Sequence, residues 1–283
     1  MTAEWLTGRF RSIVSSDSGL GKMTRRIYPT RFGQMHLRSN DGKGKGVPLV
    51  LLHLSPRSGA MWETFQERLE RPTHAPDRLG YGFSDAPPWA LSLEQYAQST
   101  VDTLKAAGVQ GEVDVMGIHT GSLEAIEVAH QLGSQVRRVI VVGMPLFSTE
   151  EQQRQLEKYS EQTLRPATEG GHVLGAWRGG FAFRQPPYDL ADVHRRFVEH
   201  VLAANPGAAF RAACSYPIEK KLKSLKAPLT VFAPHDEIIE QTLRVKPLLK
   251  PGATFVDLPE MAQDPFHADL DRMVTLVNRH LPL

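Results

Sequence analysis

The chain has 283 residues, and its 33 Lys and Arg side chains nearly balance its 31 Asp and Glu side chains, which leaves a formal net charge of +2. This balance argues against a nucleic-acid-binding protein, and the single cysteine, Cys214, excludes an internal disulfide and cysteine-pair zinc or redox motifs. The longest apolar run, 47–54, is too short to cross a bilayer, and residues 1–21 lack the apolar core of a signal peptide, so we expect a soluble, cytoplasmic protein without a membrane partner.

The first half of the chain predicts alternating strands and helices. Residues 1–24 resemble a loosely structured arm, and residues 26–29 and 34–38 flank Phe32-Gly33 as a hairpin. Beyond it, apolar runs alternate with segments of helical period, two of which end at glycines 108 and 133, a typical helix stop signal. This alternation is typical of βα units around a mostly parallel sheet. The expected strands are 48–53, 73–77, 112–116 and 136–142, and the expected helices are 60–69, 93–107 and 122–132.

The alternation stops between residues 147 and 216. This stretch has helical patterns, glycine pairs and Pro186-Pro187 but no strand candidate, which predicts a helical insertion between two sheet strands. The α/β pattern then resumes with expected strands 229–233 and 254–258 and expected helices 238–249 and 270–280. The sequence therefore predicts one α/β core, made of residues 25–146 and 217–283, with an insertion at 147–216.

A glycine-flanked histidine stands where an expected strand passes into an expected helix. Residues 117–121 read Gly-Ile-His-Thr-Gly, and in a nucleophile elbow of this form the central residue is normally Ser, exposed on a strained turn. Ser122 and Thr120 are poorer candidates for the centre because neither has small residues two positions before and after it. The glycines select His119, and Ser122 is expected to begin the helix, where its hydroxyl would satisfy a free backbone N–H.

Three other segments agree with this reading in order and spacing. Residues 50–56 (VLLHLSP) end a strand, residues 75–85 read APDRLGYGFSD, and residues 228–236 (PLTVFAPHD) form a late strand that ends in an acid. Together with the elbow they resemble the α/β-hydrolase superfamily, in its lidded, haloperoxidase- and epoxide-hydrolase-like branch. The resemblance covers about residues 25–283 and implies an α/β-hydrolase fold, a mostly parallel central sheet flanked by helices, with 147–216 as a helical lid.

The sequence departs from the family pattern at three places around one pocket. His119 replaces the nucleophilic Ser, and Leu54 replaces the usual Gly of the oxyanion turn, where a bulky residue is expected to narrow the site or alter its backbone path. Gln263 stands where the family has its terminal His, and the nearest histidine, His267, lies one helical turn later.

The resemblance implies a role for each candidate site residue. Asp236 would orient an imidazole, although a carboxylate that caps a helix is its alternative reading, and His267 would be a second base, although a surface histidine is nearly as good a reading. His53 would support the oxyanion turn. The backbone N–H groups of Ser55 and Thr120 would stabilise an oxyanion. The candidates for substrate contact are Leu54, Gln263, Trp177 and Arg178, with plain lid packing as the alternative for the lid residues.

The predicted function is hydrolysis, without a cofactor, of an ester, lactone, amide or activated C–C bond in a small, partly apolar carbonyl compound. An imidazole titrates near neutral pH, so His119 can be a nucleophile or a general base. A lyase or oxygenase reaction in which His119 removes a proton, and an inactive ligand-binding protein, are the alternatives. His119, Asp236 and His267 are also metal-ligating types, but no metal motif accompanies them, and no metal is expected. The substrate's identity stays open, as does the oligomeric state, with a homodimer as one option.

Overall fold

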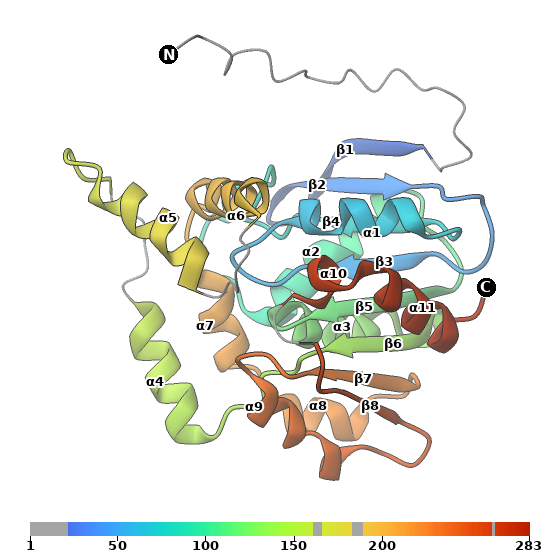
Figure 1. The fold of residues 1–283 in the computed structure, drawn as a ribbon. Helices are drawn as coiled ribbons and strands as arrows, with labels where there is room; N and C mark the ends of the chain where they lie inside the picture. Colours follow the sequence, from blue (N-terminus) through green and yellow to red (C-terminus); the bar gives the residue numbers. More distant parts are fainter. Residues whose placement is uncertain (1–21, 161–165, 183–188, 262–263) are drawn as a thin grey trace.

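The computed structural model describes residues 22–160, 166–182, 189–261 and 264–283. An eight-stranded sheet runs in the order β1-β2-β4-β3-β5-β6-β7-β8 (Figure 1). β1 (Met23–Thr30) pairs antiparallel with β2 (Gly33–Asn40), which pairs antiparallel with β4 (Thr73–Pro76). All other neighbours are parallel, and their strands are β3 (Leu49–Leu52), β5 (Val113–Ile118), β6 (Val136–Val142), β7 (Leu229–Pro234) and β8 (Thr254–Leu258). The expected mostly parallel α/β sheet is confirmed.

The central strands of the sheet are buried on both faces, because successive side chains point to opposite faces and both sets are apolar. In β3, Leu49 and Leu51 join one hydrophobic cluster, and Val50 and Leu52 join the other, as the two-residue period of a strand requires. Helices α2 (Leu93–Ala106), α3 (Thr120–Leu132) and α8 (Ile218–Ser224) cover one face, and α1 (Glu63–Arg68) and α11 (Leu270–His280) cover the other (Figure 1). Both faces are therefore packed, which leaves the carboxyl ends of the strands and the loops that follow them as the expected place for a ligand site.

Several predicted boundaries shift. The helix expected at 60–69 is a 3₁₀ turn, Gly59–Trp62, followed by α1, and the helix expected at 238–249 divides into α9 (Ile239–Leu243) and a 3₁₀ turn, Lys246–Leu248. Pro247 lacks the N–H that a continuous helix would need there. Met23 and Thr24, which were expected in the arm at 1–24, pair with β2 as part of β1, and residues 1–21 lie outside the described part of the chain.

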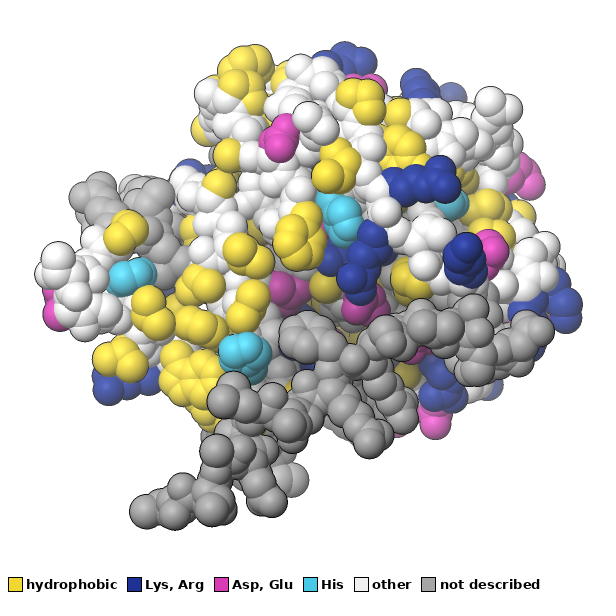
Figure 2. Space-filling model, turned by 90° about the horizontal axis from the view of Figure 1, so that it is seen from above, with side chains coloured by type: hydrophobic (Ala, Val, Ile, Leu, Met, Phe, Trp, Pro, Cys, Tyr) yellow, Lys and Arg dark blue, Asp and Glu magenta, His cyan; other side chains and the backbone are white. Residues whose placement is uncertain are grey.

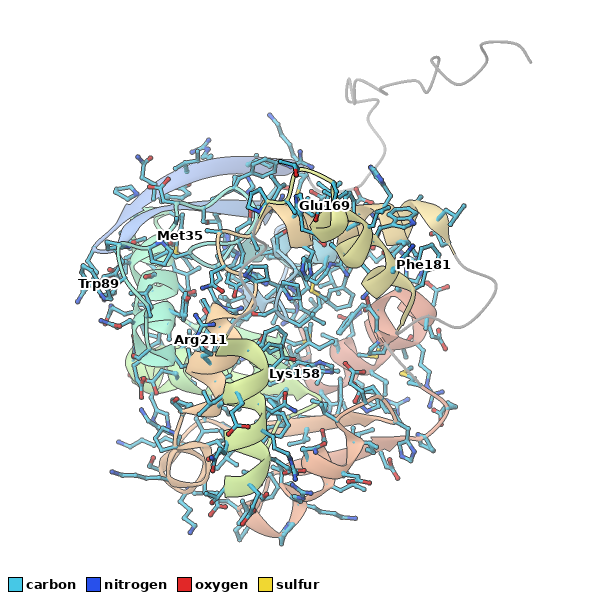
Figure 3. All side chains as sticks on the ribbon, turned by 90° about the vertical axis from the view of Figure 1, so that its left-hand side faces the viewer. Met35, Trp89, Lys158, Glu169, Phe181 and Arg211 are labelled. Atoms are coloured by element: carbon cyan, nitrogen blue, oxygen red, sulfur yellow. The ribbon has the colours of Figure 1, made fainter. Side chains whose placement is uncertain are left out.

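The described residues of 147–216, where the insertion was expected, form four helices between β6 and α8. They are α4 (Thr149–Ser160), α5 (Gly171–Ala182), α6 (Leu190–Leu202) and α7 (Ala208–Cys214), and no strand occurs among the described residues of 147–216. α4 packs with α7 and α5 with α6. In Figure 1 they lie to the left of the sheet, and Figure 3 shows them from that side, with Lys158 on α4 and Arg211 on α7.

The surface of the insertion carries apolar side chains. Figure 2 shows hydrophobic groups gathered over this side of the molecule. The large exposed ones on α5 and α6 are Val173, Leu174, Leu190, Val201 and Leu202. No helix in the described ranges combines the length and the apolar composition that a membrane span requires.

Candidate active site

The elbow between β5 and α3 has the strained geometry that its sequence predicts. His119 adopts φ 50° and ψ −114°, a region that side chains rarely occupy. A Cβ on Gly117 would lie 2.0 Å from the carbonyl oxygen of Gly121, and a Cβ on Gly121 would lie 2.2 Å from that of Leu52. Only glycine fits at either flanking position, so the motif fixes His119 at the centre of the turn.

The imidazole of His119 lies against another glycine. Gly143, which follows β6, has φ 59°, and a Cβ there would come within 2.8 Å of His119 Cδ2. The backbone N–H of His119 also donates to the Val142 carbonyl at 3.0 Å. The ring therefore lies at the carboxyl ends of the parallel strands, which is where open α/β sheets bind their ligands.

His119 and Asp236 form a hydrogen-bonded pair. Nε2 of His119 lies 2.8 Å from Oδ2 of Asp236, which follows β7, and the carboxylate is buried. The other oxygen, Oδ1, accepts from the Ile238 N–H at 3.0 Å, so Asp236 also stabilises the turn before α9. Because an ionised carboxylate only accepts, Nε2 carries the proton and Nδ1 is left as the lone-pair nitrogen.

The acidic surroundings of His119 favour its charged form. Burial of the ring opposes protonation, but the hydrogen bond and charge of Asp236 outweigh it and raise the pKa of His119 above its ordinary 6.5. The charges of Glu237 and Asp264 act in the same direction, and Oε1 of Glu237 lies 3.8 Å from Nδ1. The neutral form of His119, which can act as a base, therefore becomes the major form at a higher pH than it does in a free imidazole.

The two groups expected to bind an oxyanion contact each other. The Ser55 N–H donates to Thr120 Oγ1 at 2.8 Å, and Thr120 Oγ1 donates to Ser55 Oγ at 3.3 Å, both residues being buried. The Ser55 amide, which the oxyanion role requires to be free, thus already has an acceptor. The Thr120 N–H belongs to the first residue of α3, where helix amides have no partner within the helix.

Ser122 is buried inside the elbow. Its hydroxyl lies 3.0 Å from the Gly117 carbonyl and 2.9 Å from the Gly143 carbonyl, and the side chain has no exposed surface. It donates to carbonyls instead of accepting from an N–H, and the helix begins two residues earlier, at Thr120, because the strained residue before it ends the strand. This geometry leaves Ser122 no path to a substrate.

A buried ion pair supports the turn that carries Ser55. Arg78 pairs with Glu124 at 2.7 Å through Nε, and its Nη1 donates to Ser55 Oγ at 2.8 Å. The Arg78 N–H donates to His53 Nε2 at 2.9 Å. Burial, together with the charge of Arg78, lowers the pKa of His53 to about 3, so this histidine is neutral and holds the turn, the role expected for it.

The candidate contact residues lie in different places. Leu54 is half-buried against the hydrophobic cluster of α1 and α11, and its φ is not positive, so the turn does not need glycine there. Trp177 packs edge-on against Phe181 (5.5 Å) and Phe197 (5.7 Å), which joins α5 to α6 (Figure 3 labels Phe181). Arg178 is exposed, and Gln263 lies outside the described residues.

His267 contacts the insertion, whereas Asp236 contacts His119. His267 lies on the short helix α10 (Pro265–Ala268), with its Nδ1 3.9 Å from Oδ1 of Asp192 on α6. Its side chain is exposed. The structure therefore brings two of the three expected catalytic residues together and gives the third a neighbour on α6. No group of three or more His, Cys, Asp or Glu side chains among the described residues is arranged to hold a metal ion.

Sequence reasoning did not single out the ionic contacts that join α6 to the core. Glu199 pairs with Arg57 and accepts from Ser58 Oγ at 2.6 Å, and Arg196 pairs with Asp264. Asp264 was detectable, because it follows Gln263 directly. The pairing of Arg57 with Glu199 could not be found in the sequence, because the two residues are 142 positions apart and no motif connects them.

Comparison with known proteins decides the family. Residues 49–276 match the family model described as Alpha/beta hydrolase family. The chain belongs to the alpha/beta hydrolase family. The match confirms the resemblance drawn from the elbow and its companion segments, and it spans the parallel strands as well as the helices between β6 and β7.

Two curated relatives of this alpha/beta hydrolase are 2-hydroxymuconate semialdehyde hydrolases. The protein of Pseudomonas sp. (strain CF600) is 23% identical over 214 residues, which make up 69% of each chain. The protein of Pseudomonas putida is 29% identical over 106 residues, 36% of this chain and 37% of that protein. The chain thus matches little more than a third of the length of the P. putida relative.

A solved structure shows the same fold over nearly the whole chain. The enol-lactonase from Burkholderia xenovorans LB400 has a TM-score of 0.75 to this alpha/beta hydrolase at 18% identity, covering 91% of this chain and 100% of that one. At such low identity the likeness concerns the fold alone. Together, the family and its hydrolase relatives support a hydrolase.

Proposed function

We propose that this alpha/beta hydrolase cleaves an ester, lactone, amide or activated C–C bond of a small, partly apolar carbonyl compound, with His119 and Asp236 as its catalytic pair. The 2.8 Å hydrogen bond between an imidazole at the elbow and the acid after β7 carries this proposal. In a Ser-His-acid triad a separate histidine stands between nucleophile and acid. Here one imidazole reaches from the elbow to the acid, so a two-residue unit replaces the three-residue one.

The pair supplies a base whose reacting atom is defined. Asp236 holds Nε2–H and fixes the tautomer, which presents Nδ1 to the substrate. As a general base, Nδ1 takes a proton from water while the water oxygen bonds to the carbonyl carbon. The imidazolium returns that proton to the leaving atom as its bond to the carbonyl carbon breaks, which yields a carboxylic acid and the protonated leaving group. As a nucleophile, Nδ1 would bond to the carbonyl carbon as the bond to the leaving group breaks and that group takes a proton from water. A second water would then cleave the acyl-imidazole, which yields the carboxylic acid and restores the imidazole.

The names of similar proteins suggest an activated substrate. The curated relatives are named for a 2-hydroxymuconate semialdehyde and the solved structure for an enol lactone. In the first name a carbonyl group is conjugated with an enol, and in the second an acyl group is bonded to the oxygen of an enol. We therefore favour enol-type carbonyl compounds as the first substrates to test, bound between the sheet edge and α4–α7, which would act as the lid.

A reaction that begins with proton removal from the substrate is the second candidate. One observation suggests it: Thr120 Oγ1 uses the Ser55 N–H, which leaves fewer free donors for the tetrahedral intermediate of hydrolysis. The same panel of compounds separates the two candidates: hydrolysis releases an acid and a leaving group, whereas proton abstraction exchanges a substrate C–H with solvent deuterium.

Replacement of His119 tests the proposal. His119→Ala should lower kcat/KM for enol esters and lactones by about 10²-fold or more, the usual contribution of a positioned base. His235→Ala is the matched control, because that histidine is the chain neighbour of Asp236 but pairs with Asp257 at the surface. Activity that survives His119→Ala unchanged would rule out His119 as the catalytic residue.

A further inference from the structure

A hydroxyl oxygen fills the place that an oxyanion would take beside Ser55. A backbone N–H carries one hydrogen and makes one good hydrogen bond along its direction, at about 2.9 Å from nitrogen to oxygen. Thr120 Oγ1 lies 2.8 Å from the Ser55 nitrogen and accepts that hydrogen. We call the point occupied by Thr120 Oγ1 the oxyanion position. A substrate oxygen cannot reach the Ser55 N–H while Thr120 Oγ1 is there.

The hydroxyl of Thr120 is held in this position by a buried network. It donates to Ser55 Oγ at 3.3 Å, and Ser55 Oγ also accepts from Arg78 Nη1 at 2.8 Å. Arg78 is paired with Glu124, whose second oxygen accepts from Thr100 Oγ1 at 2.8 Å. All five residues are buried, and the β-branched side chain of threonine has few rotamers. The occupation is therefore built into the core.

The oxyanion position belongs to the catalytic site. Thr120 is the chain neighbour of His119, and Ser55 follows the turn at the end of β3, the strand paired with β5. In the family resemblance the same two residues supply the oxyanion donors. The hydroxyl thus competes with a substrate oxygen next to the reacting imidazole.

We propose that Thr120 is a specificity-determining residue whose hydroxyl occupies the oxyanion position and restricts hydrolysis to carbonyl compounds with a stabilised leaving group, such as enol and aryl esters or lactones. This inference rests on the proposed hydrolysis. Loss of one oxyanion donor typically lowers kcat by about 10²–10³-fold. A substrate whose leaving group stabilises negative charge tolerates that loss, whereas a simple alkyl ester does not.

Three variants separate occupation of the position from other effects. Thr120→Ala empties it, Thr120→Ser keeps a hydroxyl in it, and Thr120→Val fills it with a methyl group that cannot accept from Ser55. Each is made in the His119→Ala protein, and calorimetry measures the Kd of methyl phenylphosphonate, a tetrahedral anion that resembles the intermediate of ester hydrolysis. Thr120→Gly offers a second way to empty the position if Thr120→Ala does not fold.

The proposal expects Thr120→Ala or Thr120→Gly to tighten phosphonate binding at least tenfold, with little change in Thr120→Ser and Thr120→Val. Equal binding by all variants would overturn it, and so would an equal gain in Thr120→Val. In the His119-containing protein, Thr120→Ala should also raise kcat/KM for ethyl acetate relative to phenyl acetate, and an unchanged ratio would contradict the proposal. Because phosphonate binding needs no catalysis, absence of His119-dependent hydrolysis would count against the proposed function alone.

Discussion

Nε2 of His119 and Oδ2 of Asp236 lie 2.8 Å apart although 117 positions separate the two residues in the sequence. The strained turn after β5 brings one partner to the sheet edge, and the end of β7 brings the other. Gly143 leaves room for the ring between them.

The pH dependence of activity should follow the raised pKa of His119. Its neutral form is the base, so kcat/KM should rise with pH and reach half its limit above pH 6.5, the ordinary value of the group. Asp236→Asn removes the negative charge that helps to raise this pKa, and should move the rise to lower pH while lowering the limiting rate. Steady-state profiles of both proteins check this, and coincident midpoints would refute the assigned role of Asp236.

The free energy of unfolding should also depend on pH through the raised pKa of His119. A histidine whose pKa is raised by folding contributes stability that is fully present below the unfolded pKa, 6.5, and is lost as pH rises through the folded pKa. The stability difference between the native protein and Asp236→Asn should therefore shrink from about pH 6 to about pH 9. Urea unfolding of both proteins at the two pH values measures it. A difference that grows with pH would contradict the pairing.

Gly143→Ala should remove activity by displacing the imidazole. The new Cβ would lie 2.8 Å from His119 Cδ2, and the residue keeps φ near 59°. Gly133→Ala is a matched control, because Gly133 has φ 58° and no atom lies within 4 Å of the place that its Cβ would take. Both changes should cost about 1–2 kcal/mol in backbone strain, but only the first should lower kcat. Equal kinetic effects of the two would show that strain alone is responsible.

Ser122→Ala should leave a working enzyme. The hydroxyl donates to buried carbonyls, and its loss should cost about 1 kcal/mol of stability. Thermal unfolding and kcat/KM for the same enol esters are compared with those of the native protein. A folded Ser122→Ala protein without activity would make Ser122 a nucleophile candidate again.

The docking of α6 should depend on Glu199. This carboxylate pairs with Arg57 and accepts from Ser58. Glu199→Ala leaves buried Arg57 with only the more distant carboxylate of Asp264, whose Oδ2 lies 3.7 Å from Nη1, at a cost of about 3 kcal/mol. Hydrogen exchange should then speed up in α6 more than in α2. The double variant Arg57→Met, Glu199→Leu should recover most of the stability. Unchanged exchange in α6 after Glu199→Ala would show that other contacts hold the helix.

The fold was predictable because its determinants are local. Continuous apolar runs in β3 and at the end of β6, and glycines after two helices, mark elements before any contact is known. The elbow was equally clear, since Gly117 and Gly121 are required by backbone contacts within a few residues or to the adjacent strand. His119 and Asp236 could be placed together because the ends of parallel strands share one edge.

The rest of the site depends on side-chain geometry that no pattern encodes. Whether the Ser55 N–H is free is decided by the rotamer of Thr120. The contact of His267 with α6 follows from how an insertion packs on a distant loop, and the pattern of α10 gives no sign of it. Most helix ends shifted by one or two residues, which is the usual variation at frayed helix ends. The larger change within 238–249 occurs where Pro247 cannot continue a helix.

The burial of Ser122 has a practical consequence for finding this enzyme among others. Serine hydrolases are commonly detected in mixtures by fluorophosphonate reagents, which need an exposed, activated hydroxyl. At this elbow the central residue is an imidazole, and the nearby hydroxyls of Thr120 and Ser122 are both buried and hydrogen-bonded. Such a screen would pass over the elbow, and an electrophile selective for imidazoles would be the appropriate label.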